Sequence, residues 1–316
     1  MDNRDRVQAA VAVVGATATG KSELSLRLAR ELDGEVINAD SMQLYRGMDI
    51  GTGKLSAAER GDVPHHLLDI WDVAETASVS EYQRLARAVI ADVQARGRTP
   101  ILVGGSGLYI RAAIDNLEFP GTDPAVRVRL EGELVALGPA ALHAKLASAD
   151  PAAAAAILPS NGRRIVRALE VIELSGRPFS ATLPGYEAVL PAVQIGLAVP
   201  RPSLDERIGA RVRQMFRDGL VDEVTRLADA AAPCGGLRAG LTASRALGYA
   251  QVLRFLDGDW TETEAEDETV RATRRFARRQ DSWFRRDPRV RWLDASESVP
   301  TPVALTAMAD SAGAGS

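Results

Sequence analysis

Short, uninterrupted apolar runs recur along the chain and predict buried strands. Four such runs stand out: VAVVG at 11–15, EVINAD at 35–40, TPILVGG at 99–105 and AVQIGLAV at 192–199. Stretches with apolar residues at helical spacing, such as 21–32, lie between most of them. A strand that is covered on both faces needs no polar alternation, and strands that alternate with helices form parallel sheets. The pattern therefore predicts an α/β fold built on a doubly wound parallel sheet.

The alternation of strands and helices stops after the third of these runs. Three helical patterns follow one another there, at 123–138, 150–158 and 162–176. The first two begin with Asp as a helix cap and Pro in the first turn. Helices with no strand between them indicate an insertion, and the Ala, Gly and Ser of the chain's end indicate disorder. The predicted division is an α/β core at 1–122 and 185–300, a helical insertion at 123–184 and a disordered tail at 301–316.

A phosphate-binding motif follows the first predicted strand directly. GATATGKS, from Gly15 to Ser22, fits G-x-x-x-x-G-K-[ST], with a strand before it and a helix after it. The backbone amides of residues 17–22 are expected to point inward around an anion at the start of the helix. Lys21 adds a positive charge, and the Ser22 hydroxyl is the expected Mg²⁺ ligand. The predicted phosphate-binding loop consists of Gly15, Ala16, Thr17, Ala18, Thr19, Gly20, Lys21 and Ser22.

The position of the next carboxylate bears on what happens to the bound phosphate. Nucleotide-hydrolysing enzymes with this loop hold Mg²⁺ with a second carboxylate at the end of another strand, but PILV is followed here by GGSGLY. Asp40 closes the EVINAD strand instead, at the expected carboxyl edge of the sheet. It could take a proton from an acceptor that attacks the phosphorylated group, or it could cap the segment SMQLYRG. The residues alone therefore predict group transfer from a phosphorylated donor to an unspecified acceptor.

The distribution of charge is more informative than its total. The net charge is −4, yet residues 271–291 hold nine arginines and two aspartates. Such a local basic surface can bind a phosphate backbone on an acidic protein, although a solvated helix would show the same pattern.

Several classes of protein are disfavoured by what the sequence lacks. No segment approaches the ~20 apolar residues of a membrane span, and the first ten residues do not resemble a signal peptide. A single cysteine, Cys234, excludes a disulfide framework, and three histidines are too few for a structural zinc site. We therefore expect a cytoplasmic protein that does not bind a membrane.

Several motifs, taken in order, resemble those of the tRNA dimethylallyltransferases. They are GATATGKS, NADSMQLYRGMDIGTGK, PHHLLD, ILVGGSGLY, RRIVRALEVIELSGRP, RVRQMFRDGLVDEV, ALGY and TRRFARRQDSWFRR, and they span residues 11–286. The resemblance implies Mg²⁺-assisted transfer of a dimethylallyl group from dimethylallyl diphosphate to N6 of adenosine 37 of tRNA. That adenosine lies 3′ of the anticodon in tRNAs that read codons beginning with U. The implied partners are the anticodon stem-loop and the donor, with no obligate protein partner, and a monomer is implied.

The resemblance also implies roles for individual residues. Asp40 matches the general base, and Lys21, Arg211 and Thr17 match the other catalytic positions. The positions that match tRNA contacts are Asp40, Ser41, Met42, Gln43, Ser106, Arg127, Arg163, Arg164, Arg167, Arg245, Gly248 and Tyr249. Ala16, Thr19, Ser22 and Ser106 depart from the usual family residues, but Ser22 and Ser106 keep the hydroxyl. Each arginine could instead be a surface ion-pair partner.

Three other interpretations stay open on the sequence. A small-molecule kinase would bind ATP in the same loop and hold its acceptor through Asp40. An adenine-nucleotide prenyltransferase would share the chemistry but use a free nucleotide as the acceptor. A non-catalytic RNA-binding protein with a vestigial loop is disfavoured by the intact Lys21, Ser22 and Asp40.

Overall fold

The chain forms two compact units in a computed structural model, which describes residues 9–182, 185–228 and 235–306. The core unit contains Met1–Ile114 and Leu190–Ser316, and the helical unit contains Asp115–Val189. The sequence places the insertion at 123–184, so the structural boundaries lie a few residues outside it on each side. Cys234 lies outside the described residues.

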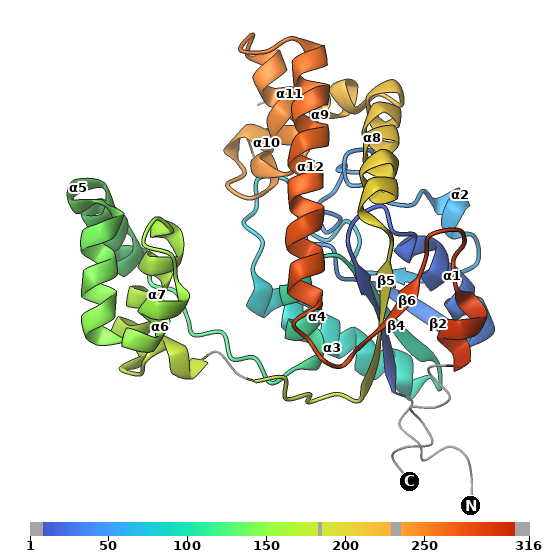
Figure 1. Cartoon of the computed structure of the whole chain (residues 1–316), viewed down its shortest axis with the longest axis horizontal. Helices are drawn as coiled ribbons and strands as arrows, with labels where there is room; N and C mark the ends of the chain where they lie inside the picture. The colour runs from blue at the N-terminus through green and yellow to red at the C-terminus, as the bar shows by residue number, and fades with distance from the viewer. Residues whose placement is uncertain (1–8, 183–184, 229–234, 307–316) are drawn as a thin grey trace, which may run out of the picture. The chain divides into compact units, whose positions relative to one another are not determined.

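A parallel sheet of six strands, in the order β3-β2-β4-β1-β5-β6, forms the centre of the core unit (Figure 1). Its strands are β1 (Ala10–Gly15), β2 (Gly34–Asn38), β3 (His65–His66), β4 (Thr99–Gly104), β5 (Ala192–Ala198) and β6 (Val290–Asp294). The predicted α/β fold is confirmed, and the four predicted strands are β1, β2, β4 and β5. The sequence did not reveal the two edge strands, because β3 has only two residues and β6 has no continuous apolar run.

The other elements of the core unit are helices and short helical turns. In the core unit they are α1 (Lys21–Glu31), α2 (Ala57–Arg60), α3 (Val79–Ala95), α4 (Gly107–Ile114), α8 (Arg201–Arg217), α9 (Leu220–Ala228), α10 (Gly236–Ala239), η2 (Ala243–Arg245), α11 (Tyr249–Leu256) and α12 (Glu262–Phe284). The long helix α12 packs against α8 and α11 and also contacts β1. Within the described part of the chain, no helix is both long and apolar enough to cross a membrane.

Strand β1 shows why its sequence is apolar without interruption. Val11 and Val13 lie in one buried cluster with Leu24 and Leu28 of α1. The residues between them point to the opposite face of the sheet, and all six residues of β1 are buried. Hydrogen bonds to β4 on one side and to β5 on the other place β1 at the centre of the sheet. The residue that follows this strand is therefore held at a fixed point of the sheet's carboxyl edge.

The predicted disordered tail is wrong for residues 301–306. These residues are helical, and Thr301 and Ala304 are buried. Ala304 and Leu305 pack against the cluster that holds Val11 and Leu24. The composition of the segment hid this contact, because two apolar residues suffice to dock a short helix on an existing core. Residues 307–316 lie outside the described part of the chain.

The helical unit contains α5 (Pro124–Ala149), α6 (Pro151–Ala156), α7 (Gly162–Ser175) and η1 (Phe179–Thr182). Asp123 and Asp150 cap α5 and α6 through their side chains, as the Asp-Pro pairs predicted. The first half of α5 stops at Gly138, whose φ is 79°, and Pro139 begins a second half that the sequence analysis did not predict. Leucines of both halves share a buried cluster with Ile165 of α7, so the unit has a core of its own.

Candidate active site

A cavity of about 610 Å³ opens where the central strands of the core unit end. Its walls come from the loop after β1, the segment after β2, and parts of α8 and α12. The predicted site residues that line it are Thr17, Ala18, Gly20, Lys21, Ser22, Asp40, Ser41, Met42, Gln43, Arg211, Arg245 and Gly248. The fold thus brings together the predicted phosphate-binding loop, the predicted base and the predicted Arg211.

The phosphate-binding loop has the open backbone that an anion needs. Gly15, Ala18 and Gly20 all have positive φ values, of 135°, 64° and 94°. Ala18 is the exception among them, because a non-glycine residue in this region costs about 1 kcal/mol or more. No hydrogen-bond acceptor for the backbone amides of residues 18–22 is found among the described residues. These amides are therefore available to an anion.

The amide of Thr17 departs from the expected pattern because it already has a partner. It donates to Oε1 of Gln280 at 2.9 Å, and Nε2 of Gln280 donates to the carbonyl of Gly105 at 2.9 Å. Gln280 comes from α12 and is only 5% exposed. One buried carboxamide therefore joins the phosphate-binding loop to the segment after β4. The expectation that all the amides of residues 17–22 face the anion needs this correction.

Three residues of the predicted loop do not line the cavity. Gly15 is buried at the end of β1, while Ala16 and Thr19 line a separate cavity of about 330 Å³. The Thr19 hydroxyl donates to the Ala16 carbonyl at 2.9 Å. These residues shape the loop, and the anion site is formed by the rest of it.

Replacing Gln280 is expected to weaken anion binding selectively. Gln280→Ala removes two buried hydrogen bonds and should reduce the affinity for inorganic diphosphate about tenfold. Gln280→Glu should reduce it about a hundredfold, because it adds a negative charge beside the anion. Calorimetric titration with inorganic diphosphate measures the affinity of both variants. The matched control is Gln214→Ala, which replaces an exposed glutamine of α8. Unchanged diphosphate affinity in Gln280→Glu would show that the carboxamide has no part in anion binding.

The cavity is lined by two carboxylates, Glu23 and Asp40, and by four cationic side chains, Lys21, Arg211, Arg245 and Arg279. Nζ of Lys21 donates to the Ala16 carbonyl at 2.6 Å. Burial lowers the pKa of Lys21 to about 8, while Asp40 opposes this shift and Arg211 adds to it. Burial also lowers the pKa of Arg211, and again Asp40 opposes the shift. Nη1 of Arg211 lies 3.4 Å from the Thr17 hydroxyl. The four cations that line the cavity outnumber its two carboxylates, so the cavity favours an anionic ligand.

Asp40 is held at the end of β2 by the side chain of Asn38. Oδ1 of Asn38 accepts from the Asp40 amide at 2.9 Å, and Nδ2 donates to the Asp40 carbonyl at 3.1 Å. Oδ1 of Asp40 accepts from the Met42 amide at 3.0 Å, which closes a turn and caps no helix. Oδ2 accepts no hydrogen bond from any described residue. One oxygen therefore fixes the carboxylate, and the other is available to take a proton.

Other predicted RNA-contacting residues have structural partners of their own. Ser106 accepts from the Ser41 amide at 3.3 Å and does not line the cavity. Tyr249 is fully buried, so its side chain has no exposed surface with which to touch RNA. In the helical unit, Arg127 and Arg167 both pair with the buried carboxylate of Glu170.

Arg163 and Arg164 differ from these two arginines of the same unit. Both are exposed, and no ion pair of either side chain is found among the described residues. They are therefore the arginines of α7 with most freedom to meet a phosphate backbone.

Comparison with known proteins decides the family. The family model of the IPP transferases matches residues 43–287. The chain belongs to the IPP transferase family. It is similar to the tRNA dimethylallyltransferase of Streptomyces avermitilis, with 66% identity over 298 residues, which cover 94% of each chain. The protein of that name from Thermobifida fusca is 66% identical over 302 residues, which cover 93% of each chain.

Solved IPP transferases share this fold. The tRNA isopentenylpyrophosphate transferase of Bacillus halodurans is 43% identical, with a TM-score of 0.69, over 97% of this chain and 96% of that one. A eukaryotic dimethylallyltransferase, described as acting on tRNA, is 25% identical, with a TM-score of 0.77, over 92% of this chain and 74% of that one. The protein is therefore a transferase, as the resemblance of its motifs implied.

The donor set of this cavity fits Mg²⁺. The Ser22 hydroxyl lines the cavity beside the anion site and has no hydrogen-bond partner among the described residues. No group of three or more His, Cys, Asp or Glu that could hold a metal ion is found in the described ranges. Mg²⁺ takes one or two protein ligands together with waters and phosphate oxygens, so it does not need such a group.

Three residues that shape this site escaped the sequence analysis. Gln280 lies 263 positions from Thr17, its partner in the loop. Gly53 leaves room for the guanidinium of Arg211, since a Cβ there would lie 1.7 Å from Nη2. Glu223 supports the turn that carries Gly53. Only Gly53 gave a visible signal, as a glycine inside the motif GTGK.

Proposed function

We propose that the protein transfers a dimethylallyl group from dimethylallyl diphosphate to N6 of adenosine 37 in tRNAs that read codons beginning with U. The observation that carries this proposal is the shared cavity of Lys21, Arg211 and Asp40. It combines an anion site with a carboxylate that can take a proton, and membership of the IPP transferase family supports the choice of chemistry. The reaction belongs in the cytoplasm, where the tRNA is.

In the proposed step one bond breaks, one bond forms and one proton is transferred. The bond between the allylic carbon and the diphosphate oxygen breaks, and a bond from that carbon to N6 forms. Lys21, Arg211 and the Thr17 hydroxyl stabilise the charge that develops on the departing diphosphate. Oδ2 of Asp40 accepts the proton that N6 loses. Ser22 would hold a Mg²⁺ ion, which would supply further positive charge to the diphosphate.

The target adenine must leave its stack to reach such a cavity. An exocyclic amine inside a stacked anticodon loop is inaccessible, so the base has to be extruded into the protein. Arg245, Gly248 and the segment from Asp40 to Gln43 line the cavity and would surround the base. The helical unit and α12 would hold the stem-loop through its phosphates and its shape.

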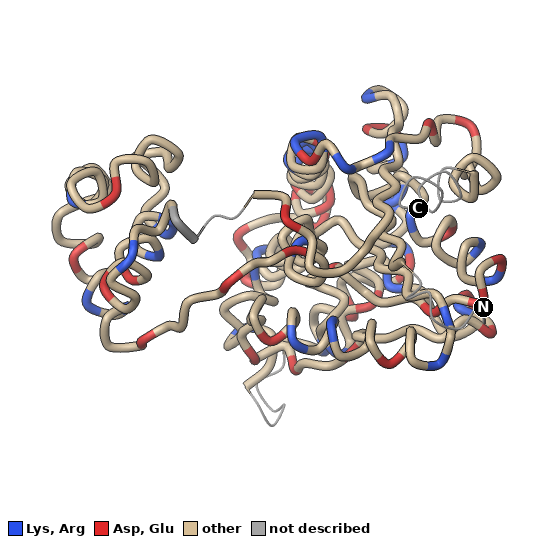
Figure 2. The backbone as a smooth tube through the Cα atoms, turned by 90° about the horizontal axis from the view of Figure 1, so that it is seen from below, with Lys and Arg blue, Asp and Glu red and all other residues tan. Residues whose placement is uncertain are grey.

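The arginines of α12 are not equivalent in this respect. Figure 2 shows basic and acidic positions interspersed along the helices. Arg274 donates to the carbonyl of Asp205 at 3.1 Å, and Arg275 pairs with Glu268. For the exposed side chains of Arg278 and Arg279, no ion pair is found among the described residues. These two arginines are the ones of α12 best placed to contact phosphates.

Replacing Arg278 and Arg279 together is expected to lower the salt dependence of tRNA binding. Loss of two phosphate contacts should reduce the slope of log K against log salt by about 1.5. The control variant Arg271→Ala with Arg275→Ala, whose side chains already pair with Glu268, should change the slope less. Filter binding of tRNA over a salt series measures both slopes. Equal slopes in the wild type and in the first variant would mean that this face of α12 is merely solvated.

A transfer assay tests the proposed function itself. Labelled dimethylallyl diphosphate and Mg²⁺ are incubated with an anticodon stem-loop that carries the target adenosine. A second tube has guanosine at that position, and a third has AMP in place of RNA. Label in the first tube alone supports the proposal, and label in AMP would make the protein a nucleotide prenyltransferase. No label in any tube, with turnover of ATP in the same preparation, would favour the kinase.

A further inference from the structure

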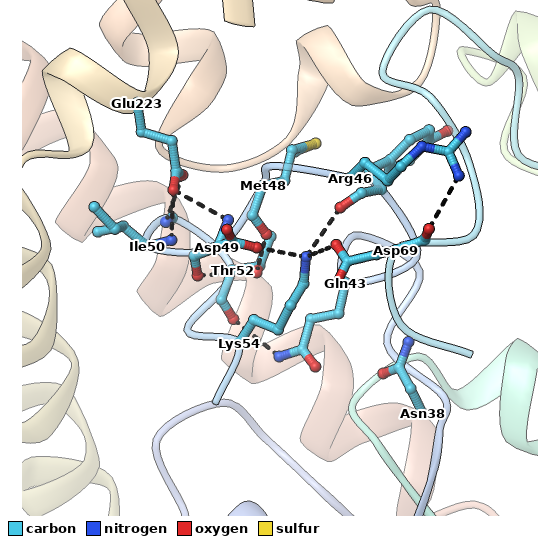
Figure 3. A network of polar contacts seen from close by, with 12 residues as sticks. Asn38, Gln43, Arg46, Met48, Asp49, Ile50, Thr52, Lys54, Asp69 and Glu223 are labelled. Carbon is cyan, nitrogen blue, oxygen red and sulfur yellow. Dashed lines mark hydrogen bonds and ion pairs between the residues drawn. The ribbon is translucent and has the colours of Figure 1, made fainter. Parts of the chain in front are cut away.

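Gln43 projects into the cavity with its carboxamide held in one orientation. Nε2 of Gln43 donates to the carbonyl of Thr52 at 3.2 Å (Figure 3). Oε1 accepts no hydrogen bond from any described residue. A carbonyl can only accept, so the NH₂ group must face Thr52. The carboxamide therefore presents to the cavity a free acceptor oxygen and the second hydrogen of Nε2.

The carbonyl of Thr52 is fixed by the turn from Met48 to Lys54, here called the 48–54 turn. The Thr52 hydroxyl donates to the Met48 carbonyl at 2.7 Å, and the amide of Lys54 donates to the Asp49 carbonyl at 3.0 Å. Nζ of Lys54 is almost fully buried and donates to Asp49 at 2.7 Å and to Asp69 at 2.6 Å. The turn is thus closed by its own backbone hydrogen bonds, and Lys54 ties it to Asp69 in the segment after β3 (Figure 3).

A single carboxylate from α9 holds the other side of the 48–54 turn. Glu223 is 2% exposed and accepts from the amides of Asp49, Ile50 and Gly51, at 3.1, 2.8 and 3.2 Å (Figure 3). The Tyr249 hydroxyl donates to it at 2.5 Å. Burial and the charge of Glu223 raise the pKa of Tyr249, so this hydroxyl stays protonated and remains a donor. A Cβ at Gly51 would lie 2.4 Å from the Tyr249 ring, which shows how closely the turn and α11 are packed.

We propose that Glu223 is a positioning residue that makes Gln43 selective for a base with an amino group at position 6. By holding the 48–54 turn, it fixes the Thr52 carbonyl and so the orientation of the Gln43 carboxamide. Oε1 then accepts from N6–H of adenine, and Nε2 donates to N7, the pairing that amide side chains make with this base. This inference rests on the proposed function, because it assumes that the base in the cavity is the tRNA target.

A base with an oxygen at position 6 meets a mismatch at the same place. Oε1 of Gln43 and the oxygen of hypoxanthine are both acceptors. If the side chain were free, its carboxamide would rotate and Nε2 would donate to the oxygen of the base instead. Here that rotation would set Oε1 against the Thr52 carbonyl and lose the bond to it. The cost of the mismatch is thus imposed by the turn and, through it, by Glu223.

Binding of two stem-loops that differ only in the target base tests the inference. One carries adenosine and the other inosine, and the quantity measured is the ratio of their dissociation constants. For the wild type we expect the adenosine loop to bind at least about tenfold more tightly than the inosine loop. Glu223→Ala should lower the ratio to about 2, and Gln43→Ala should do the same. The double variant should lower it no further, because the two residues act in one chain of contacts.

The ratio separates positioning from a merely structural role. If Glu223 only stabilised the fold, its loss would weaken the binding of both stem-loops by the same factor and leave the ratio of their dissociation constants unchanged. Glu223→Gln and Tyr249→Phe keep the buried shape and test the same claim should Glu223→Ala not fold, since each should lower the ratio about threefold. An unchanged ratio in both, or a wild type that binds both loops equally, overturns the inference. Failure of the proposed function is distinct, because it would show as absent transfer to the adenosine loop.

Discussion

Replacement of Asp40 by asparagine is expected to reduce turnover by about 10²–10⁴-fold, the usual effect of losing a general base. The variant keeps Oδ1, which accepts from the Met42 amide at 3.0 Å, so the turn that presents the side chain survives. It replaces the free Oδ2 by an NH₂ group, which cannot take a proton. The loss should therefore fall on the chemical step, and the affinity for tRNA should stay within a few-fold of the wild type.

Single-turnover transfer with saturating donor and tRNA measures this step directly. Asp62→Asn is the matched control, because the side chain of Asp62 is 83% exposed. Its rate should equal that of the wild type. A normal single-turnover rate in Asp40→Asn would remove Asp40 from the mechanism, and a proton acceptor would have to be sought elsewhere in the cavity.

Replacement of Lys21 by methionine should have the second largest effect, on donor binding. Lys21 lines the cavity beside amides that have no acceptor among the described residues, and it is the one cation of the predicted loop from Gly15 to Ser22. Losing a charged hydrogen bond to diphosphate costs about 1.5–3 kcal/mol, so we expect donor affinity to fall about 10- to 100-fold. Calorimetric titration with dimethylallyl diphosphate checks this value, and undiminished affinity would contradict the role of the loop.

The pH dependence of donor binding gives the same residue a second test. The pKa of Lys21 is about 8 in the ligand-free protein, well below that of a lysine in water. Only the protonated form attracts the diphosphate, whose terminal phosphate is fully ionised in this range. Donor affinity of the wild type should therefore fall as the pH rises through 8. The affinity of Lys21→Met should be flat between pH 7 and 9, and an equally steep fall in that variant would assign the titration to another group.

The lowered pKa of Lys21 also predicts the sign of its effect on stability. A lysine whose pKa is lower in the folded state than in the unfolded chain costs stability. The cost is full below pH 8 and is lost as the pH rises from 8 to 10.5, where the folded lysine is already neutral and the unfolded one is still protonated. At neutral pH, Lys21→Met should thus leave the ligand-free protein as stable as the wild type or more stable, by about 1 kcal/mol. Thermal unfolding without ligand measures this difference. A variant that loses donor affinity and keeps its stability has lost a binding group and has not lost its fold.

Features that depend on residues close to one another in the sequence could be predicted. The run at β1, the loop after it and the first turn of α1 form one uninterrupted motif, and each follows from local backbone preferences. Asp40 was found for the same reason, because it closes an apolar run at the edge of the sheet. The Asp-Pro caps of the helical unit are local signals as well.

Features that depend on contacts between distant residues could not be predicted. Gln280 and Glu223 look like ordinary polar positions of helices, and only the fold places them against Thr17 and the 48–54 turn. That Arg127 and Arg167 contact tRNA stays a prediction. Their shared pairing with the buried Glu170 could not be predicted, because Glu170 lies on α7, far in the sequence from Arg127. The helix at 301–306 was missed because its stability comes from a core built by other segments.

The central claim is that the phosphate in the loop after β1 belongs to a leaving group. Dimethylallyl diphosphate that carries a carbon label in the prenyl group and a phosphorus label in the diphosphate tests it in one reaction with the anticodon stem-loop. The account predicts that the carbon label enters the RNA and that the phosphorus label is released as inorganic diphosphate, one for each prenyl group transferred. Phosphorus label in the RNA, or transfer of phosphate from ATP with no prenylation, would contradict it.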